Sequence, residues 1–189
     1  MKALVTGGGG FLGRYIVEQL LERGDEVVVA ARGDYPELVA MGVDLVRGDL
    51  ADAATAQKAC DGVDIVFHVA AKAGLWGAWD DFYRTNVVAT KNLLEACKTQ
   101  GIGKFVFTSS PSVIFDNQPH TGCDESHPYP AHYESFYPQT KAMAEQLVIK
   151  ANSDTMLTVS LRPHLIWGPR DAHILPGIIA RAKEGKLIQ

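Results

Sequence analysis

The chain has 189 residues, of which 47% are hydrophobic and 21% charged, and its formal net charge is −4. This length and composition are typical of a globular protein with a core of its own. The slight acidity argues against nucleic acid or an anionic membrane surface as the main partner. We expect a cytoplasmic protein, because no apolar run could cross a bilayer and the first strand-like run leaves no room for a signal peptide after Met1.

Cysteine and histidine are sparse and scattered. Cys60, Cys97 and Cys123 are odd in number and far apart, which favours reduced thiols over a disulfide framework. The six histidines show no compact spacing of the kind that metal ligands have. The sequence therefore predicts no metal site.

The glycine-rich stretch Thr-Gly-Gly-Gly-Gly-Phe-Leu-Gly, residues 6–13, follows an apolar run that reads as a buried strand, residues 3–5. It leads into a helical pattern that continues to residue 21. Gly7, Gly10 and Gly13 are the spaced set, and glycine lets the backbone turn tightly and approach a pyrophosphate. The helix that follows offers free N–H groups to an anion. Such glycines can serve only to turn the chain, but a strand before and a helix after them favour nucleotide binding.

Strand and helix patterns alternate along the remaining chain. The sequence predicts strands over residues 26–31, 43–47, 64–69, 104–108 and 155–161, and helices over 51–60, 80–98, 134–151 and 174–183, with Gly185 ending the last. This order predicts a doubly wound parallel α/β sheet of the Rossmann type. In the helix over 80–98, one stripe is apolar except for one amide: Phe82, Asn86, Ala89, Leu93 and Cys97.

A second motif is Tyr137-Pro138-Gln139-Thr140-Lys141. A tyrosine and a lysine four residues apart project from the same helix face, and the ammonium is expected to lower the phenol pKa so that the pair can act in acid–base catalysis. Together with the Thr-Gly-x-x-Gly-x-x-Gly spacing, this resembles the extended branch of the short-chain dehydrogenase/reductase superfamily. Residues 1–189 would then be its NAD(P)-binding domain, truncated before the smaller part that closes over substrate.

The resemblance implies a set of catalytic residues. Tyr137 and Lys141 would be the catalytic pair, and Ser110 would orient the substrate oxygen, with Ser109 and Ser112 as weaker choices. Asn86 would help to place the lysine through water, although a local hydrogen bond to the backbone is an equal alternative for this amide.

The resemblance also implies contacts with a nicotinamide dinucleotide and a small-molecule substrate. The expected cofactor-binding residues are Gly7, Gly10, Phe11, Leu12, Arg32, Asp49, Leu50, Ala70, Ala71, Tyr137, Lys141 and Pro163. Asp49 could accept the adenine amino group, cap the helix expected from Ala51, or do both.

We expect NADP rather than NAD. NAD-preferring relatives carry an acid at the end of the second strand, where this chain has Ala31, and Arg32 follows with a guanidinium suited to a 2′-phosphate. Arg14 could add to this preference, whereas Asp34 could instead turn toward the ribose.

Two further segments resemble the sequences of 3β-hydroxysteroid dehydrogenase-type enzymes and 2-alkyl-3-oxoalkanoate reductases. They are residues 108–113 (Thr-Ser-Ser-Pro-Ser-Val) and 161–169 (Leu-Arg-Pro-His-Leu-Ile-Trp-Gly-Pro). This implies an oxidoreductase that interconverts a secondary alcohol and a ketone on an apolar substrate, for which Trp76 and Trp79 would suit the pocket. Pro111 and Ser112 stand where dehydratases of this branch carry acids, which disfavours water elimination.

The alternatives to an oxidoreductase are a sugar-nucleotide epimerase and a non-catalytic dinucleotide sensor. The resemblance further implies a homodimer formed through the helices over 80–98 and 134–151.

Overall fold

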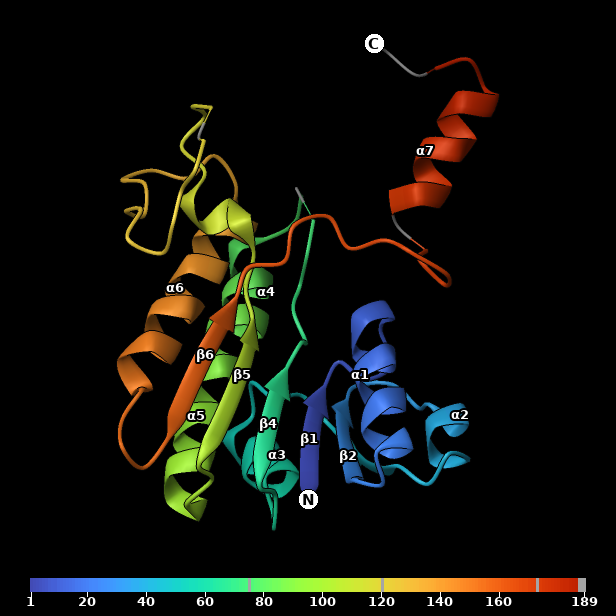
Figure 1. The fold of residues 1–189 in the computed structure, drawn as a ribbon, viewed down its shortest axis with the longest axis vertical. Helices are drawn as coiled ribbons and strands as arrows, with labels where there is room; N and C mark the ends of the chain where they lie inside the picture. The colour runs from blue at the N-terminus through green and yellow to red at the C-terminus, as the bar shows by residue number, and fades with distance from the viewer. Residues whose placement is uncertain (75, 120, 173, 187–189) are drawn as a thin grey trace.

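The computed structural model describes residues 1–74, 76–119, 121–172 and 174–186 (Figure 1). Its strands are β1 (Lys2–Thr6), β2 (Glu26–Ala31), β3 (Asp44–Arg47), β4 (Ile65–His68), β5 (Lys104–Thr108) and β6 (Leu157–Leu161). They form one parallel sheet in the order β3-β2-β1-β4-β5-β6. The doubly wound α/β fold predicted from the sequence is therefore confirmed.

The helical segments are α1 (Phe11–Glu22), α2 (Pro36–Val39), α3 (Ala53–Ala59), α4 (Trp79–Phe82), the π-helix η1 (Tyr83–Val88), α5 (Ala89–Gln100), the 3₁₀-helix η2 (Pro111–Ile114), α6 (Phe136–Ala151) and α7 (Ile174–Lys183). Helices α1 and α2 lie on one side of the sheet, and α3, α5 and α6 lie on the other (Figure 1). Helix α7 lies apart from the sheet.

Alternation along the buried strands builds two cores. In β1, Ala3 and Val5 face α1 and α2, where they pack with Val17 and Leu38. Leu4 faces the opposite side and packs in the cluster built by α3, α5 and α6. Strands that are apolar on both faces are typical of a parallel sheet covered by helices on both sides.

Two predicted helices differ from those observed. The helix predicted over 80–98 is divided into α4, a π-helical segment and α5, although its predicted apolar stripe is buried throughout: Phe82, Asn86, Ala89, Leu93 and Cys97. The helix predicted over 51–60 begins at Ala53, because the carboxylate of Asp52 accepts the N–H groups of Ala54 and Thr55. Asp52, and not Asp49, is therefore the N-cap.

The segment that follows β6 crosses the carboxyl ends of the strands and reaches α1 (Figure 1). The Tyr15 hydroxyl donates to the Pro169 carbonyl over 2.8 Å. The Arg170 guanidinium donates to both carboxylate oxygens of Glu18, over 2.7 and 2.8 Å, and lies 4.2 Å from the Tyr15 ring. These contacts tie the segment to the helix that begins at the glycine-rich turn.

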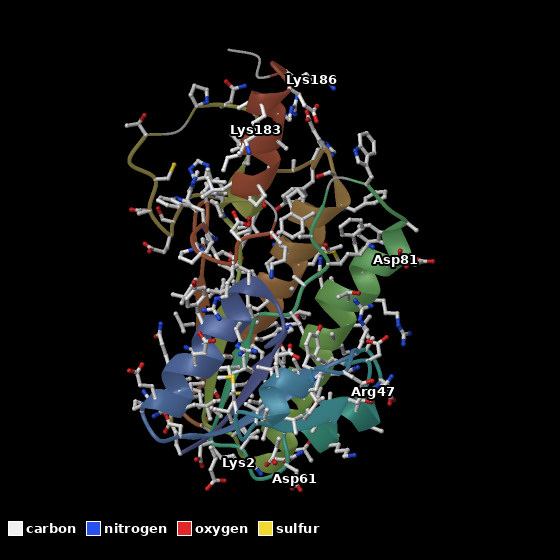
Figure 2. All side chains as sticks on the ribbon, turned by 90° about the vertical axis from the view of Figure 1, so that its right-hand side faces the viewer. Lys2, Arg47, Asp61, Asp81, Lys183 and Lys186 are labelled. Atoms are coloured by element: carbon white, nitrogen blue, oxygen red, sulfur yellow. The ribbon has the colours of Figure 1, made fainter. Side chains whose placement is uncertain are left out.

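The opposite end of the molecule carries the amino-terminal edge of the sheet. There the Lys2 ammonium donates to the Asp61 carbonyl over 3.2 Å. Lys183 and Lys186, in α7 and just after it, lie at the other end of the molecule from Lys2 and Asp61 (Figure 2). Within the described residues, none of the helices has the length and apolarity needed to cross a membrane.

Candidate functional site

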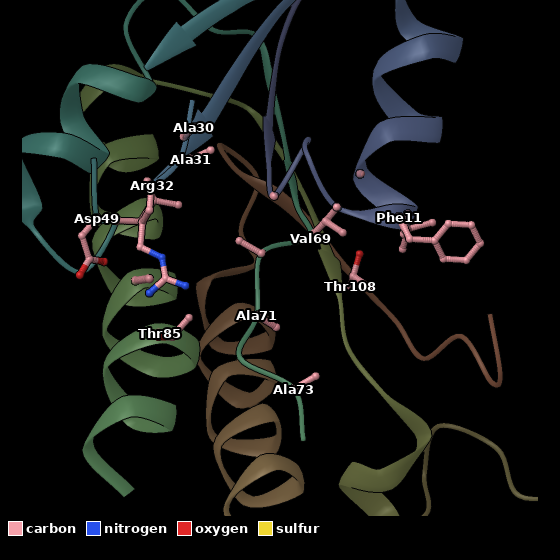
Figure 3. A pocket seen from close by; sticks show the side chains of 18 of the residues that line it. Phe11, Ala30, Ala31, Arg32, Asp49, Val69, Ala71, Ala73, Thr85 and Thr108 are labelled. Atoms are coloured by element: carbon pink, nitrogen blue, oxygen red, sulfur yellow. The ribbon is translucent and has the colours of Figure 1, made fainter. Parts of the chain in front are cut away.

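A cavity of about 660 Å³ lies at the carboxyl ends of the strands. It opens where chain order reverses between β1 and β4, which is the usual ligand site of an open parallel sheet. Figure 3 shows Arg32 and Asp49 together at one end, and Phe11 and Thr108 toward the other. Eleven of the predicted cofactor residues line it: Gly7, Gly10, Phe11, Leu12, Arg32, Asp49, Leu50, Ala70, Ala71, Tyr137 and Lys141.

The glycine-rich turn is closely packed, which explains its composition. Gly7 has φ +70°, and a Cβ there would lie 2.9 Å from the Ala70 nitrogen. A Cβ on Gly13 would lie only 2.2 Å from the Gly7 carbonyl oxygen, so α1 can approach the turn only without a side chain. Gly10 is the N-cap of α1, and no side chain caps the helix. The N–H groups at this end of α1 are therefore not bonded by a capping side chain, and helix N-termini of this kind suit anions.

Charged side chains gather beyond the end of β2. The carboxylate of Asp49 accepts the Ala51 N–H over 2.9 Å and the Arg84 Nε–H over 3.0 Å. Burial acts to raise the pKa of Asp49, but these two hydrogen bonds and the charge of Arg32 outweigh it and hold the pKa below its usual value. The carboxylate is therefore ionised and already ordered at this end of the cavity.

Asp34 and Arg14, the two other side chains that could affect the choice between NADP and NAD, form ion pairs with other residues. Asp34 pairs with Arg47 at 3.1 Å, so its charge is engaged away from the position expected for the ribose. Arg14 pairs with Glu18 at 2.9 Å and contacts the Met41 sulfur, and it does not line the cavity. Arg32 remains the arginine that lines the cavity in the described structure.

Tyr35 is a cavity residue that was not expected from the sequence. Its ring lies directly against Gly9. The contact is so close that a Cβ on Gly9 would lie 2.1 Å from a ring carbon. The tyrosine thus covers the outer side of the glycine-rich turn. An aromatic residue three positions after Arg32 was the available signal, but nothing local in the sequence connects it with Gly9.

The other end of the cavity carries the predicted catalytic pair. Lys141 is buried, and its ammonium donates to the Thr108 carbonyl over 2.6 Å and lies 4.0 Å from the centre of the Phe107 ring. Burial lowers the pKa of Lys141 to about 7, while the charge of Glu145 acts in the opposite direction. A lysine whose pKa lies near neutrality is typical of a functional site.

Burial raises the pKa of the Tyr137 phenol, and a hydrogen bond with the Ser110 hydroxyl acts to lower it. The sequence pattern had led us to expect that Lys141 lowers this pKa. In the structure that ammonium is instead engaged by the Thr108 carbonyl and the Phe107 ring. Ser110 therefore lies within reach of the phenol, as expected for a triad, and its hydroxyl also contacts the Ser112 hydroxyl at 2.8 Å.

Asn86 is buried, and its hydrogen bonds are long-range in sequence. Its Oδ1 accepts the Lys72 N–H over 2.7 Å, and its Nδ2 donates to the Lys72 carbonyl and to the Thr140 hydroxyl, over 3.0 Å each. Asn86 thus bonds the backbone, as the alternative expects, but that backbone belongs to Lys72, 14 residues away, and the third partner lies 54 residues away. Asn86 fastens the segment after β4 to the first turn of α6.

Pro163 lies in a neighbouring cavity of about 620 Å³, which is largely apolar and shares Leu12, Val69, Thr108 and Ile166 with the first. Of the two tryptophans, Trp79 packs against Tyr83 and Phe136, with ring centroids 5.6 and 5.4 Å apart. Trp76 is 89% exposed. Only Trp76 therefore offers a large free apolar surface from the described part of this loop.

Buried Glu145 forms an ion pair with the partly exposed Arg162, which was likewise not expected from the sequence. Glu145 lies one turn after Lys141 in α6, and its carboxylate accepts from the Arg162 guanidinium and from the Tyr129 hydroxyl. Burial acts to raise the pKa of Glu145, but these hydrogen bonds keep it below its usual value. The spacing Tyr137, Lys141, Glu145 was the signal that could have identified it.

Comparisons with known proteins agree with this geometry. A 2-alkyl-3-oxoalkanoate reductase from Stenotrophomonas maltophilia (strain K279a) is 48% identical, over 99% of this chain and 57% of the relative. The human sterol-4-alpha-carboxylate 3-dehydrogenase, decarboxylating, is 39% identical, over 98% of this chain and 50% of the relative. The solved structure of the Thermus thermophilus UDP-glucose 4-epimerase in complex with NAD superposes with a TM-score of 0.82 at 34% identity, covering all of this chain and 64% of that one.

The fold and site thus define an extended short-chain dehydrogenase/reductase. Within that class, the chain belongs to the 3-beta hydroxysteroid dehydrogenase/isomerase family, whose model matches residues 4–189. The chain spans about half of the length of the curated relatives.

Proposed function

We propose that the chain carries the dinucleotide-binding and proton-transfer residues of an NADP(H)-dependent oxidoreductase that interconverts a secondary alcohol and a ketone. One observation carries the proposal: a single cavity runs from Arg32, past the glycine-rich turn, to Tyr137 and Lys141. A dinucleotide has this order of parts, with its adenosine, its phosphates and its nicotinamide.

The residues fit such a cofactor. A side chain at Gly7 or Gly13 would collide with the backbone, so only glycine fits at these two positions. A turn without side chains is what close approach to a pyrophosphate requires. The uncapped start of α1 suits the phosphates, and Arg32 suits a 2′-phosphate. When bound, the nicotinamide supplies or accepts the hydride. That the solved epimerase holds NAD supports a nicotinamide dinucleotide in general.

The chain's own residues move the proton. The Tyr137 hydroxyl donates to or accepts from the substrate oxygen, and the Ser110 hydroxyl, which lies close to the phenol, orients that oxygen. Lys141 adds positive charge beside them, because its buried ammonium stands at the carboxyl end of β5. Asn86 keeps the first turn of α6 in place through Thr140.

We assign an apolar substrate of the 3-oxo acyl or 3β-hydroxysteroid type. The names of the relatives support this class, as does the exposed Trp76. Pro111 and Ser112 place no carboxylate beside Ser110, so the chain lacks the acid that water elimination needs at that point.

The test is turnover followed by nicotinamide absorbance. The protein is mixed with NADPH and a 2-alkyl-3-oxo ester or a 3-oxosteroid, and in a parallel arm UDP-glucose is offered with NAD. We expect NADPH consumption with the ketone and no conversion of the sugar nucleotide. Conversion of UDP-glucose alone would favour the epimerase, which the structural similarity to an epimerase supports as the second candidate. Binding of dinucleotide without turnover of either substrate would favour the sensor.

A further inference from the structure

A chain of buried polar side chains, linked at one point through the main-chain carbonyl of Asn86, runs from the end of β1 to α6. Its members are Thr6, His68, Thr90, Asn86 and Thr140, all buried. Of these, the proposed chemistry uses only Asn86 and its partner Thr140. Buried polar groups are costly unless they are fully hydrogen-bonded, so a network of this length specifies one arrangement of the elements that it joins.

The donors and acceptors fix the direction of every proton in this chain. The Thr6 hydroxyl accepts the N–H groups of Val69 and Ala70, over 3.1 and 3.0 Å, which occupies both of its lone pairs. Its own proton therefore points at His68 Nδ1, 2.7 Å away. Nδ1 thus carries no proton, and the Nε2–H of His68 donates to the Thr90 hydroxyl over 2.9 Å. The Thr90 hydroxyl in turn donates to the main-chain carbonyl of Asn86 over 2.6 Å.

His68 is held as a neutral ring by its surroundings. It packs against the rings of Phe105 and Phe107, and the charged group that faces it is the Lys141 ammonium on α6. Burial and then that charge lower the pKa of His68 to about 3. A proton on Nδ1 would also point at the Thr6 oxygen, whose lone pairs are already used.

The two ends of the network hold the same piece of main chain. At one end Thr6 binds the Val69 and Ala70 amides, and at the other Asn86 binds both the amide and the carbonyl of Lys72. Ala70 packs so closely on Gly7 that a single Cβ there would lie 2.9 Å from its nitrogen. Residues 69–72 are thereby placed against the glycine-rich turn.

We propose that neutral His68 is a positioning residue for the dinucleotide, because it sets residues 69–72 at the separation from Gly7 that the cavity requires. The proposal rests on the proposed cofactor site and adds a residue that does not itself line the cavity.

The test compares two substitutions at His68 for binding of NADPH and NADH, measured by nicotinamide fluorescence. Glutamine offers one acceptor and one donor about as far apart as the two ring nitrogens and stays neutral, whereas leucine offers neither. Because a buried group left without its partner weakens the arrangement, we expect His68→Leu to lose about tenfold in affinity for both dinucleotides. We expect His68→Gln to retain wild-type affinity within about threefold. Unchanged affinity in His68→Leu, or an equal loss in His68→Gln, would overturn the proposal.

A second pair of variants keeps the test decisive if His68→Leu does not fold. Thr6→Val removes the hydroxyl at nearly constant volume, and Thr6→Ser keeps it. We expect the valine variant to lose affinity for the dinucleotides and the serine variant to keep it, and equal affinity in the two would overturn the proposal.

Hydrogen exchange at the Val69 and Ala70 amides tests the hydrogen-bond network separately from the cofactor assignment. Faster exchange in Thr6→Val than in Thr6→Ser supports the network even if the wild type binds neither dinucleotide, and equal exchange contradicts it.

Discussion

Tyr137 and Lys141 lie one turn apart in α6, but their surroundings differ. Both line the cavity, but the tyrosine lies close to the Ser110 hydroxyl, while the ammonium of the lysine donates to the Thr108 carbonyl. We therefore propose that the Tyr137 phenol transfers the proton and that Lys141 acts as a buried charge beside it.

Substituting Tyr137→Phe should slow turnover by about 10²- to 10⁴-fold, which is the usual contribution of a general acid or base. Dinucleotide affinity should stay near wild type, because only a hydroxyl is removed. Steady-state rates and a fluorescence titration measure the two effects separately. A variant that kept its rate would show that another group transfers the proton.

His68 makes a specific prediction for stability against pH. Its folded pKa of about 3 lies below the ordinary value of 6.5, so between these values the unfolded chain binds one more proton than the folded protein. The stabilising contribution is full above pH 6.5 and is lost as pH falls toward 3, at no more than about 1.4 kcal/mol per pH unit.

The His68→Gln variant should lack this component, since glutamine does not titrate. Denaturant unfolding of both proteins from about pH 4 to about pH 7 should therefore give a difference in unfolding free energy that grows in favour of the wild type as pH rises. A difference that stayed constant over this range would mean that His68 has the same pKa in the folded and the unfolded chain, and a difference that shrank as pH rises would mean that His68 is charged in the folded protein.

At the scale of elements, the contact between α1 and the glycine-rich turn leaves no room for a side chain at Gly13. Gly13→Ala would place a Cβ 2.2 Å from the Gly7 carbonyl oxygen, so the helix must move away from the turn. We expect a loss of about 1–3 kcal/mol in unfolding free energy together with weaker dinucleotide binding. Gly177→Ala in α7 is the matched control, because nothing lies within 4 Å of its Cβ. Equal effects of the two substitutions would show that the close packing is unimportant.

What the sequence could predict depends on how local each signal is. The glycine spacing and the Tyr137–Lys141 spacing lie within single elements, and the structure brings both to one cavity. The ring of Tyr35 on Gly9 and the bonds from Asn86 to Lys72 join residues that are distant along the chain, so no local pattern indicates them. The π-helical segment within residues 80–98 was missed because its apolar stripe still fits a regular helix.

At the scale of the whole molecule, we expect a homodimer in which the helices over 80–98 (α4, η1 and α5) and 134–151 (α6) of two copies pack together. Helices α5 and α6 lie on the same side of the sheet (Figure 1), and α6 carries the apolar side chain of Ile149, which is 54% exposed. Ile149→Arg should shift light-scattering mass toward the monomer, because a charge would be buried between the copies. Val39→Arg in α2 is the control, since Val39 is equally exposed, at 53%. A monomeric wild type would contradict the expectation.

We propose that the cavity holds a nicotinamide dinucleotide and that Arg32 recognises its adenosine end. Ala31 offers no acceptor to ribose hydroxyls, and Asp34 is paired with Arg47. A hydrogen bond to a charged group contributes about 1.5–3 kcal/mol, so Arg32 should favour NADPH over NADH by about 10- to 100-fold.

The most direct measurement is the titration of the wild type and of Arg32→Ala with NADPH and NADH, followed by nicotinamide fluorescence. We predict tighter binding of NADPH to the wild type, and loss of that preference in the variant with NADH affinity little changed. Tighter binding of NADH to the wild type, or an NADPH affinity that survives the substitution, would contradict the claim.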